Sequence, residues 1–307
     1  MERILITGSS GFIGQNFIEN YQVKRAVYRG KSQSSESNTF FIENLNSETD
    51  WSDAFEGVDC IVHLAGIAHI PKATDELLES VNIKGTIRLA TEAGKAGVKR
   101  FIFLSSIGVN GKRTEKLPFS CTSPPCPHDF YSDSKYRAEE AVKRISKKYD
   151  MEFVIIRPPL VYGKGANGNF DKLRKLIEFT PFLPLKLVNN RRSFISVANL
   201  NSLIFTCVAH PKAPGNTFLA AESEAVSIKE FTNAIAKGLG NEVYQLPVPV
   251  SLMRFAGKLL GKSAIVEQLV GNLQVDSSDL KKILGWTPPY TMEESMALLK
   301  ESIKERE

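Results

Sequence analysis

The chain has 307 residues, of which 42% are hydrophobic and 24% charged, and its formal net charge is +5. These values are ordinary for a globular protein, so they exclude collagen, coiled coil and disorder as descriptions of the whole chain. No apolar run approaches the roughly 18 residues that cross a bilayer, and the N-terminus lacks a secretory-signal pattern. We therefore expect a soluble cytoplasmic protein without membrane insertion. The basic residues are scattered, so we expect no nucleic-acid partner.

The first half of the chain alternates between short apolar strands and amphipathic helices. This alternation predicts βαβ units, a parallel sheet buried on both faces and a doubly wound α/β fold. The expected strands are Arg3–Thr7, Lys24–Arg29, Asp59–Gly66, Arg100–Ser106 and Glu152–Pro158. The expected helices are Phe12–Tyr21, Asp75–Lys95 and Phe130–Lys148.

Beyond Gly163 the regular alternation stops. We expect the strand Arg192–Val197 and the helix Asn199–Val208 to rejoin the sheet. Shorter strands are expected at Thr217–Ala220 and Val243–Pro247, and helices at Phe170–Phe179, Ser227–Gly238, Ser251–Leu260, Ser277–Leu284 and Met292–Arg306. The chain then divides into a sheet-bearing part, residues 1–163 plus about 192–210, and a smaller α/β lobe, residues 164–191 plus about 211–307.

A glycine-rich loop, TGSSGFIG at Thr7–Gly14, joins the first strand to the first helix. Missing Cβ atoms let the backbone turn tightly and approach a pyrophosphate, which the free N–H groups of the helix N-terminus can bind. The position and spacing of the glycines predict a dinucleotide site of the Rossmann type. The contacts expected from this loop are Gly8, Ser10, Gly11, Phe12, Ile13 and Gly14.

The end of the second strand bears on the choice of cofactor. An acidic residue there binds the ribose 2′-hydroxyl of NAD, and an arginine accommodates the 2′-phosphate of NADP. This strand ends in Arg29 without an acid, and Lys31 and Ser32 follow. We predict NADP, with NAD as the second choice. The alternative is that Arg29 stacks on the adenine.

A Tyr-x-x-x-Lys segment, Tyr131 to Lys135, indicates proton-transfer chemistry. Residues four apart share one helix face, and a neighbouring ammonium is expected to lower the pKa of a tyrosine. Ser106 ends the fourth strand, where its hydroxyl can bind a substrate oxygen beside Tyr131. We expect Ser105 only to satisfy backbone groups at the strand end.

The four cysteines are too few for a disulfide framework in a chain of this length. Cys121, Cys126 and His128 lie close together in the sequence. Their spacing fits no common zinc pattern and a fourth ligand is missing. We therefore predict no metal site.

Taken together, these motifs resemble the extended short-chain dehydrogenase/reductase family, specifically its nucleotide-sugar epimerases, dehydratases and reductases (UDP-glucose 4-epimerase-like). The resemblance covers nearly the whole chain. Besides the glycine loop, Ser105–Ser106 and YSDSK at Tyr131–Lys135, it rests on HLAG at His63–Gly66, RPPLVYG at Arg157–Gly163, RRSFISVANL at Arg191–Leu200 and LGWTP at Leu284–Pro288.

The resemblance implies a role for each matching position. Tyr131 is the general acid/base, Lys135 tunes it and holds the nicotinamide ribose, and Ser106 binds the reacting oxygen. Asn169 and Arg192 hold the diphosphate of a UDP-sugar bound by the smaller lobe. Further cofactor contacts are implied at Leu64, Ala65, Gly66 and Pro158. His63 is expected to pack at a strand end, and Arg191 to be a solvated neighbour.

The resemblance also implies a homodimer, formed by the helix Asp75–Lys95 and the helix that carries Tyr131. For the reaction, dehydratases of this family follow the strand-end hydroxyl residue with an Asp-Glu pair, and here Ile107 and Gly108 follow Ser106. This departure excludes dehydration.

Two reactions remain, and Arg29 favours the first. It is the 4-keto reduction of a UDP-4-keto-6-deoxy-N-acetylhexosamine in polysaccharide biosynthesis; the second is the 4-epimerisation of a UDP-hexose. A remote alternative is an NADP-sensing regulator without catalysis, although such relatives commonly lose the Tyr/Lys pair that is present here.

Overall fold

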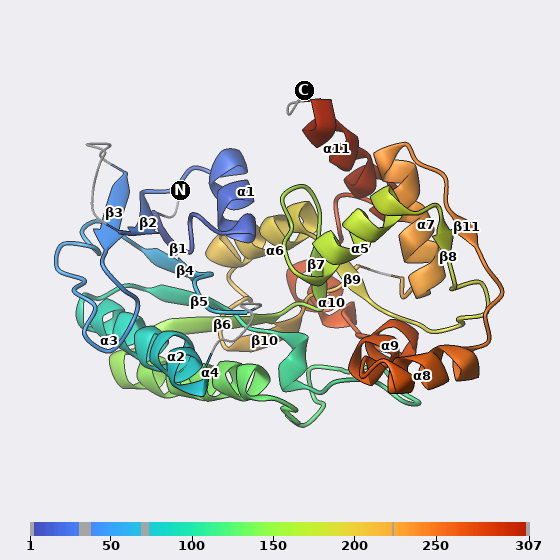
Figure 1. Cartoon of the computed structure of the whole chain (residues 1–307). Coiled ribbons are helices and arrows are strands. Elements are labelled where there is room, and N and C mark those ends of the chain that lie inside the picture. Colours follow the sequence, from blue (N-terminus) through green and yellow to red (C-terminus); the bar gives the residue numbers. More distant parts are fainter. Residues whose placement is uncertain (1–2, 31–37, 69–73, 223, 305–307) are drawn as a thin grey trace.

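The computed structural model describes residues 3–30, 38–68, 74–222 and 224–304. Its centre is a seven-stranded sheet in the order β10-β6-β5-β4-β1-β2-β3, in which all neighbouring strands are parallel (Figure 1). The chain moves outward in opposite directions from β1 and β4, which makes their border the topological switch point. The strands are β1 (Ile4–Thr7), β2 (Arg25–Arg29), β3 (Thr39–Ile42), β4 (Cys60–His63), β5 (Arg100–Leu104), β6 (Glu152–Arg157) and β10 (Asn216–Leu219).

Helices cover both faces of this sheet (Figure 1). Because side chains alternate along a strand, Ile4 and Ile6 of β1 point to one face and Leu5 to the other. The first face packs against α1 (Phe12–Asn20), α6 (Val197–Ala209) and α10 (Ser278–Leu284). The second packs against α3 (Thr86–Lys95) and α4 (Phe130–Tyr149). The doubly wound α/β fold expected from the alternation of strands and helices is confirmed.

The segment predicted as one helix, Asp75–Lys95, is not uniform. It begins as α2 (Asp75–Leu78), continues as the π-helix η1 (Glu79–Gly85) and becomes α-helical again in α3. The side chain of Asn82, in the π segment, is buried and bonds to the backbone of Ile67 and to the hydroxyl of Ser134 at 3.0 Å. The wider turn therefore accompanies a buried polar side chain, which the 3.6-residue periodicity does not anticipate.

Helix α4 places Tyr131 and Lys135 in its first two turns. Asp129 caps it through a hydrogen bond from Ser132 N at 2.8 Å, and the two residues form a capping box. Ala138 and Val142 face the sheet, and Asp150 ends the helix in a left-handed conformation, φ 52°. Because this cap fixes the first turn of α4, it also fixes the direction in which the side chain of Tyr131 points.

The second lobe has its own core beside the carboxyl end of the sheet (Figure 1). Phe194 and Phe231 stack with ring centroids 3.8 Å apart, and Tyr162 and Phe170 pack around them. Its elements are β7 (Leu160–Tyr162), α5 (Asn169–Phe179), β8 (Phe182–Leu183), β9 (Phe194–Ser196), α7 (Ile228–Leu239), β11 (Tyr244–Gln245), α8 (Val250–Leu259), α9 (Ser263–Val270) and α11 (Met292–Lys304). The short 3-10 helix η2 (Ile107–Val109) follows β5 in the sheet-bearing part.

One sequence expectation about the elements is wrong. The strand at 192–197 does not rejoin the sheet: β9 pairs with β7 in a separate two-stranded sheet, and β10 pairs with β6 instead. The helix α6 does pack on the sheet. The strands β3, β7 and β8 and the helices η2 and α9 were not among the expected elements. The division of the chain into two parts stays a prediction, although β10 lies in the main sheet.

Within the ranges given above, no helix combines the length and apolar character that crossing a bilayer requires.

Candidate active site

The residues predicted to bind the cofactor meet at the carboxyl edge of the sheet. The glycine loop follows β1, Leu64–Gly66 follows β4, Ser106 follows β5 and Pro158 follows β6. The Pro158 carbonyl accepts a hydrogen bond from Ile107 N at 3.0 Å, which holds the ends of β5 and β6 together. Ligands of open α/β sheets bind beyond this edge.

The glycine loop has no room for side chains at two of its three glycines. Gly8 has φ +77°, and a Cβ there would lie 2.8 Å from Ala65 N; a Cβ on Gly14 would overlap the carbonyl of Gly8. Gly11 caps α1 without a side-chain hydrogen bond, so the N–H groups of the first helical turn face outward without a side-chain cap. This backbone cradle fits the pyrophosphate of a dinucleotide.

A chain of hydrogen bonds through His63 lies beneath the cofactor loops. Ala65 N donates to Thr7 Oγ1, which lies 2.6 Å from His63 Nδ1, and His63 Nε2 lies 2.9 Å from Thr86 Oγ1. The Thr86 hydroxyl donates to the carbonyl of Asn82 at 2.7 Å, so the pattern of donors assigns the proton of the neutral ring to Nε2. Burial lowers the pKa of His63 to about 3, and the charge of Lys135 acts in the same direction.

His63 therefore does more than the packing expected of it. It contacts Phe101 and Phe103 through its ring, and it also ties the glycine loop to the helical segment that follows the π-helix. The sequence offered no signal for the two threonine partners, because they lie 56 and 23 residues away.

The predicted catalytic residues Ser106, Tyr131 and Lys135 lie together at the end of β5. The side chains of Ser106 and Tyr131 are hydrogen-bonded to each other, and Ser106 Oγ accepts a hydrogen bond from Gly108 N at 3.1 Å. The Lys135 ammonium donates to Leu104 O at 3.0 Å and lies 4.8 Å above the ring of Phe103. A Cβ on Gly66 would come within 3.1 Å of Lys135 Nζ, so Gly66 borders the same site.

The pKa of Tyr131 departs from the expected direction. Burial raises it to about 12, outweighing the hydrogen bond with Ser106, which lowers it. Burial also lowers the pKa of Lys135 to about 8, against the opposing charge of Glu139. In the protein alone, therefore, Tyr131 holds its proton at neutral pH and the ammonium of Lys135 does not produce the expected lowering.

A buried polar network behind this site was not anticipated. Ser105 donates to the carboxylate of Glu139, so its expected role as a strand-end residue bonded only to backbone is wrong. Glu139 receives two hydrogen bonds from the guanidinium of Arg157, which also donates to Asn110 Oδ1 at 3.0 Å. The network joins the ends of β5 and β6 to α4.

In the second lobe, Asn169 is the first residue of α5, after Gly168 with φ 75°. Arg192 lies at a bridge to Val226 and donates from NH1 to the carbonyls of Gln268 and Gly271 at 2.8 and 3.0 Å. Burial lowers the pKa of Arg192 to about 10. Among the residues placed in the structure, no carboxylate forms a salt bridge with Arg192, so this half-buried cation suits an anionic ligand.

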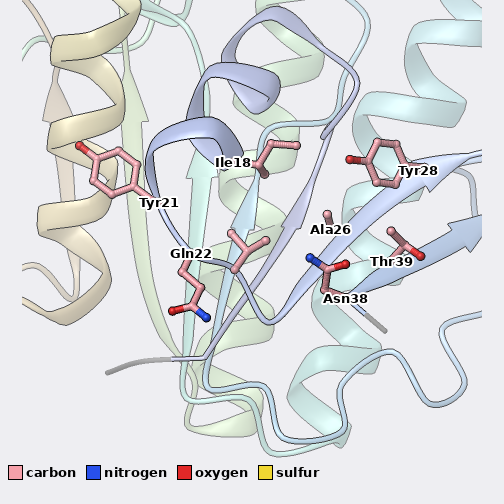
Figure 2. A pocket seen from close by; sticks show the side chains of 8 residues that line it. Ile18, Tyr21, Gln22, Ala26, Tyr28, Asn38 and Thr39 are labelled. Carbon is pink, nitrogen blue, oxygen red and sulfur yellow. The ribbon is translucent and has the colours of Figure 1, made fainter. Parts of the chain in front are cut away.

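Arg29 ends β2 with an exposed side chain at the same edge of the sheet. Lys31 and Ser32, which follow it in the sequence, lie outside the residues that the structure describes. A surface pocket of about 740 Å³ lies between α1, β2 and β3, lined by Tyr21, Tyr28 and Asn38 among others (Figure 2). None of the predicted catalytic residues lines this pocket, so we do not assign it to the candidate site.

One of the cysteines considered for metal binding has another partner. Cys121 Sγ donates to the carboxylate of Asp279 at 2.8 Å. Over the described part of the chain, the structure gathers no group of three or more His, Cys, Asp or Glu side chains that could hold a metal ion.

Comparisons with known proteins identify relatives of this chain and of its fold. Residues 4–221 match the model of the NAD dependent epimerase/dehydratase family. A protein of Vibrio cholerae named UDP-glucose 4-epimerase is 40% identical to this chain. The match covers 95% of this chain and 92% of that protein. The fold matches UDP-glucose 4-epimerase of Thermotoga maritima, solved with UDP-glucose (TM-score 0.75, 21% identity, 99% of both chains). It also matches RMD of Pseudomonas aeruginosa, solved with NADPH (TM-score 0.75, 19% identity, 100% of both chains).

Proposed function

Because the chain belongs to the NAD dependent epimerase/dehydratase family, we propose that it transfers a hydride between a nicotinamide cofactor and C4 of a UDP-sugar. The observation that carries the proposal is the meeting of Ser106, Tyr131 and Lys135 at the edge of the sheet that also bears the glycine loop. Two hydroxyls and an ammonium beside a dinucleotide cradle suit the oxidation of an alcohol or the reduction of a ketone.

The cofactor, when bound, supplies or accepts the hydride. Tyr131 exchanges the matching proton with the C4 oxygen, and its raised pKa keeps it protonated at neutral pH, which is the form that reduction starts from. Ser106 is hydrogen-bonded to Tyr131 and so stands where it can hold the same oxygen. Lys135 stays positively charged below its pKa of about 8. In the protein alone this charge does not lower the pKa of Tyr131, so we expect the phenolate that oxidation requires only when the oxidised cofactor is bound.

The diphosphate of the sugar nucleotide is proposed to lie between Arg192 and Asn169. Arg192 supports this because it is a half-buried cation whose NH1 group donates to backbone carbonyls. A diphosphate would supply the negative charge that these neutral partners lack. Asn169 stands at the N-terminus of α5, where N–H groups also favour an anion.

Two versions of C4 chemistry remain, each favoured by one observation. The 40% identity to a protein named UDP-glucose 4-epimerase favours epimerisation of a UDP-hexose. Arg29 at the end of β2, where NAD-binding chains carry an acid, favours NADP and the reduction of a UDP-4-keto-6-deoxy-N-acetylhexosamine for polysaccharide biosynthesis. Ile107 and Gly108, which follow Ser106, carry no acid or base, and this argues against dehydration whichever of the two reactions is correct.

Incubation of the purified protein with UDP-hexoses, without added nucleotide, separates the two versions. Interconversion of C4 epimers identifies an epimerase that retains its cofactor through the cycle. Turnover only with a 4-keto sugar nucleotide plus NADPH identifies a reductase. If cofactor binds and neither activity is found with any UDP-sugar, hydride transfer at C4 is wrong and the non-catalytic sensor becomes the better explanation.

We also propose a homodimer and a cytoplasmic location. The helices α3 and α4 lie side by side on one face of the sheet (Figure 1), and together with α2 they offer the surface through which such a dimer would form. Sedimentation equilibrium of the intact protein tests the dimer, and a monomer at micromolar concentration would contradict it.

A further inference from the structure

The far edge of the second lobe exposes large apolar side chains on α8 and α9, the orange-red helices at the lower right of Figure 1. We call this surface the α8–α9 face; its exposed members are Leu252 (54%), Phe255 (60%), Leu259 (72%), Leu260 (70%) and Ile265 (54%). Single exposed apolar residues are common on proteins, but these five occur within fourteen residues of sequence, on two helices that pack together.

Helix α8 has two apolar sides, and folding uses only one of them. Met253 and Gly257 are buried, and Gly257 lies so close to Val266 of α9 that a Cβ would overlap it. Leu252, Phe255 and Leu259 follow one another at spacings of three and four on a different side of the helix. That second stripe is not needed to hold α8 against α9, and its side chains stay exposed.

The helices that carry the exposed stripe and a neighbouring loop hold an excess of basic residues. The loop 111–119 lies against the segment that follows α9, because Thr114 N donates to Asn272 O at 3.0 Å and Phe119 N donates to Gln274 O at 2.9 Å. It adds Leu117, which is 79% exposed. Residues 112–117 and 250–267 hold two acids, Glu115 and Glu267, against six basic residues: Lys112, Arg113, Lys116, Arg254, Lys258 and Lys262.

Charged groups of both segments, residues 112–117 and 250–267, act on one carboxylate, that of Glu267. Glu267 of α9 has a lowered pKa because Arg254 hydrogen-bonds to its carboxylate, and the charges of Arg113 and Lys112 lower it further. The positive field of the loop therefore reaches α9. Lys258 and Lys262 flank the turn between α8 and α9 with exposed side chains, next to Leu259 and Leu260.

We propose that the α8–α9 face binds the surface of an anionic phospholipid bilayer, with α8 lying in the plane of the interface. Leu252, Phe255 and Leu259 enter the boundary between headgroups and acyl chains, and the lysines reach the lipid phosphates. A second copy of the chain is the competing occupant, but two such faces would bring their basic excess together. The charge therefore favours the lipid surface, and binding in the plane of the interface needs no membrane-spanning helix.

The test is co-sedimentation of the full-length protein with lipid vesicles. Wild type is expected to bind phosphatidylcholine vesicles that contain phosphatidylglycerol, to bind pure phosphatidylcholine weakly, and to dissociate at high salt. The variant Leu252→Ser/Phe255→Ser/Leu259→Ser should lose binding about tenfold or more. Its matched control is Phe179→Ser/Phe182→Ser/Leu187→Ser, which removes exposed apolar side chains from elsewhere in the same lobe and should bind like wild type.

A second pair of variants tests the charge. Lys258→Glu/Lys262→Glu should lose about tenfold or more in binding to the anionic vesicles, whereas Lys24→Glu/Lys212→Glu, at exposed positions elsewhere, should not. Failure of wild type to bind anionic vesicles, or equal loss in a variant and its control, overturns the proposal. The proposal is also overturned if the three-serine variant, and no other variant, forms a smaller oligomer in solution than wild type, because the face would then join two copies of the chain. Turnover of free UDP-sugar is expected in every variant, so the proposed function is tested separately.

Discussion

Glu139 of α4 and Arg157 at the end of β6 form a buried ion pair. Arg157 Nε lies 2.9 Å from Glu139 Oε1, and NH2 lies 2.5 Å from Oε2, with neither side chain more than 5% exposed. Glu139 stands one helical turn after Lys135, and its charge raises the pKa of that lysine against the effect of burial. The pair therefore joins β6 to α4 and also helps to keep Lys135 charged.

The first prediction follows from this pair. Glu139→Gln leaves Arg157 buried without its carboxylate, so the free energy of unfolding should fall by about 3–5 kcal/mol. The pKa of Lys135 should fall below about 8, because a charge that raises it is gone. The pH above which activity is lost should therefore fall. A pH profile of kcat measures this change, and urea unfolding measures the change in stability.

The control for Glu139→Gln is Glu140→Gln on the same helix. The Glu140 carboxylate pairs with Lys143 at 2.8 Å, and its side chain is 45% exposed, so its loss should change the free energy of unfolding by at most about 1 kcal/mol. An unchanged pH profile in Glu139→Gln would contradict the electrostatic role of that carboxylate.

Removal of the Tyr131 hydroxyl tests proton transfer. Tyr131→Phe should reduce kcat by about 10²–10⁴-fold while the dissociation constant for the cofactor changes little. Tyr136→Phe, on the same helix, should keep activity and serves as the matched control. Activity of Tyr131→Phe near the wild-type rate would show that another group moves the proton.

The titration of Tyr131 should depend on the cofactor. In the protein alone its pKa lies at about 12 because of burial, and the positive nicotinamide ring of an oxidised cofactor should lower it. The ultraviolet difference spectrum between wild type and Tyr131→Phe isolates this phenol from the other tyrosines. A phenolate that forms at the same pH with and without oxidised cofactor would contradict the expectation.

Arg29 should set the preference between the two cofactors. Wild type is predicted to bind NADPH more tightly than NADH, and Arg29→Asp should reverse the order, with a loss of about 10–100-fold for NADPH because a charge-assisted hydrogen bond to phosphate is removed. Fluorescence titration with both reduced cofactors measures the four dissociation constants. Tighter binding of NADH by wild type would exclude NADP as the preferred cofactor.

His63 should make the fold sensitive to acid. Its pKa is about 3 in the folded protein and near 6.5 when unfolded, so the unfolded chain binds the extra proton as the pH falls. The stability from this group is complete above pH 6.5 and is lost at about 1.4 kcal/mol per pH unit on the way down to about 3. Urea unfolding of wild type and His63→Gln over this interval measures the difference. Parallel curves for the two proteins would show that His63 is not buried in the neutral form.

The sequence was sufficient for those parts of the site that depend on local spacing. Tyr131 and Lys135 are one helical turn apart, so any helix places them on the same face. Gly8, Gly11 and Gly14 recur every three residues, and a tight turn between a strand and a helix brings them together. Strand-end position then placed Ser106 beside Tyr131. These relationships need no knowledge of distant partners.

What could not be predicted depends on contacts between remote segments. Glu139 and Arg157 sit on a helix and a strand, and nothing in their spacing indicates a pair. Arg192–Val197 and Thr217–Ala220 both look like strands, and only packing decides that β10 pairs with β6 while β9 pairs with β7. The pKa of Tyr131 was expected to be lowered because the lysine charge was visible in the sequence and the burial was not.

The central claim is that Ser106, Tyr131 and Lys135 direct hydride transfer at C4 of a UDP-sugar. The most direct test is to mix cofactor-loaded protein with UDP-hexoses or their 4-keto derivatives. The absorbance of the reduced nicotinamide is then measured during a single turnover. We predict a change in that absorbance with wild type, and a change at least about 10²-fold slower with Tyr131→Phe. No change with any of these sugars, in wild-type protein shown to hold its cofactor, would contradict the claim.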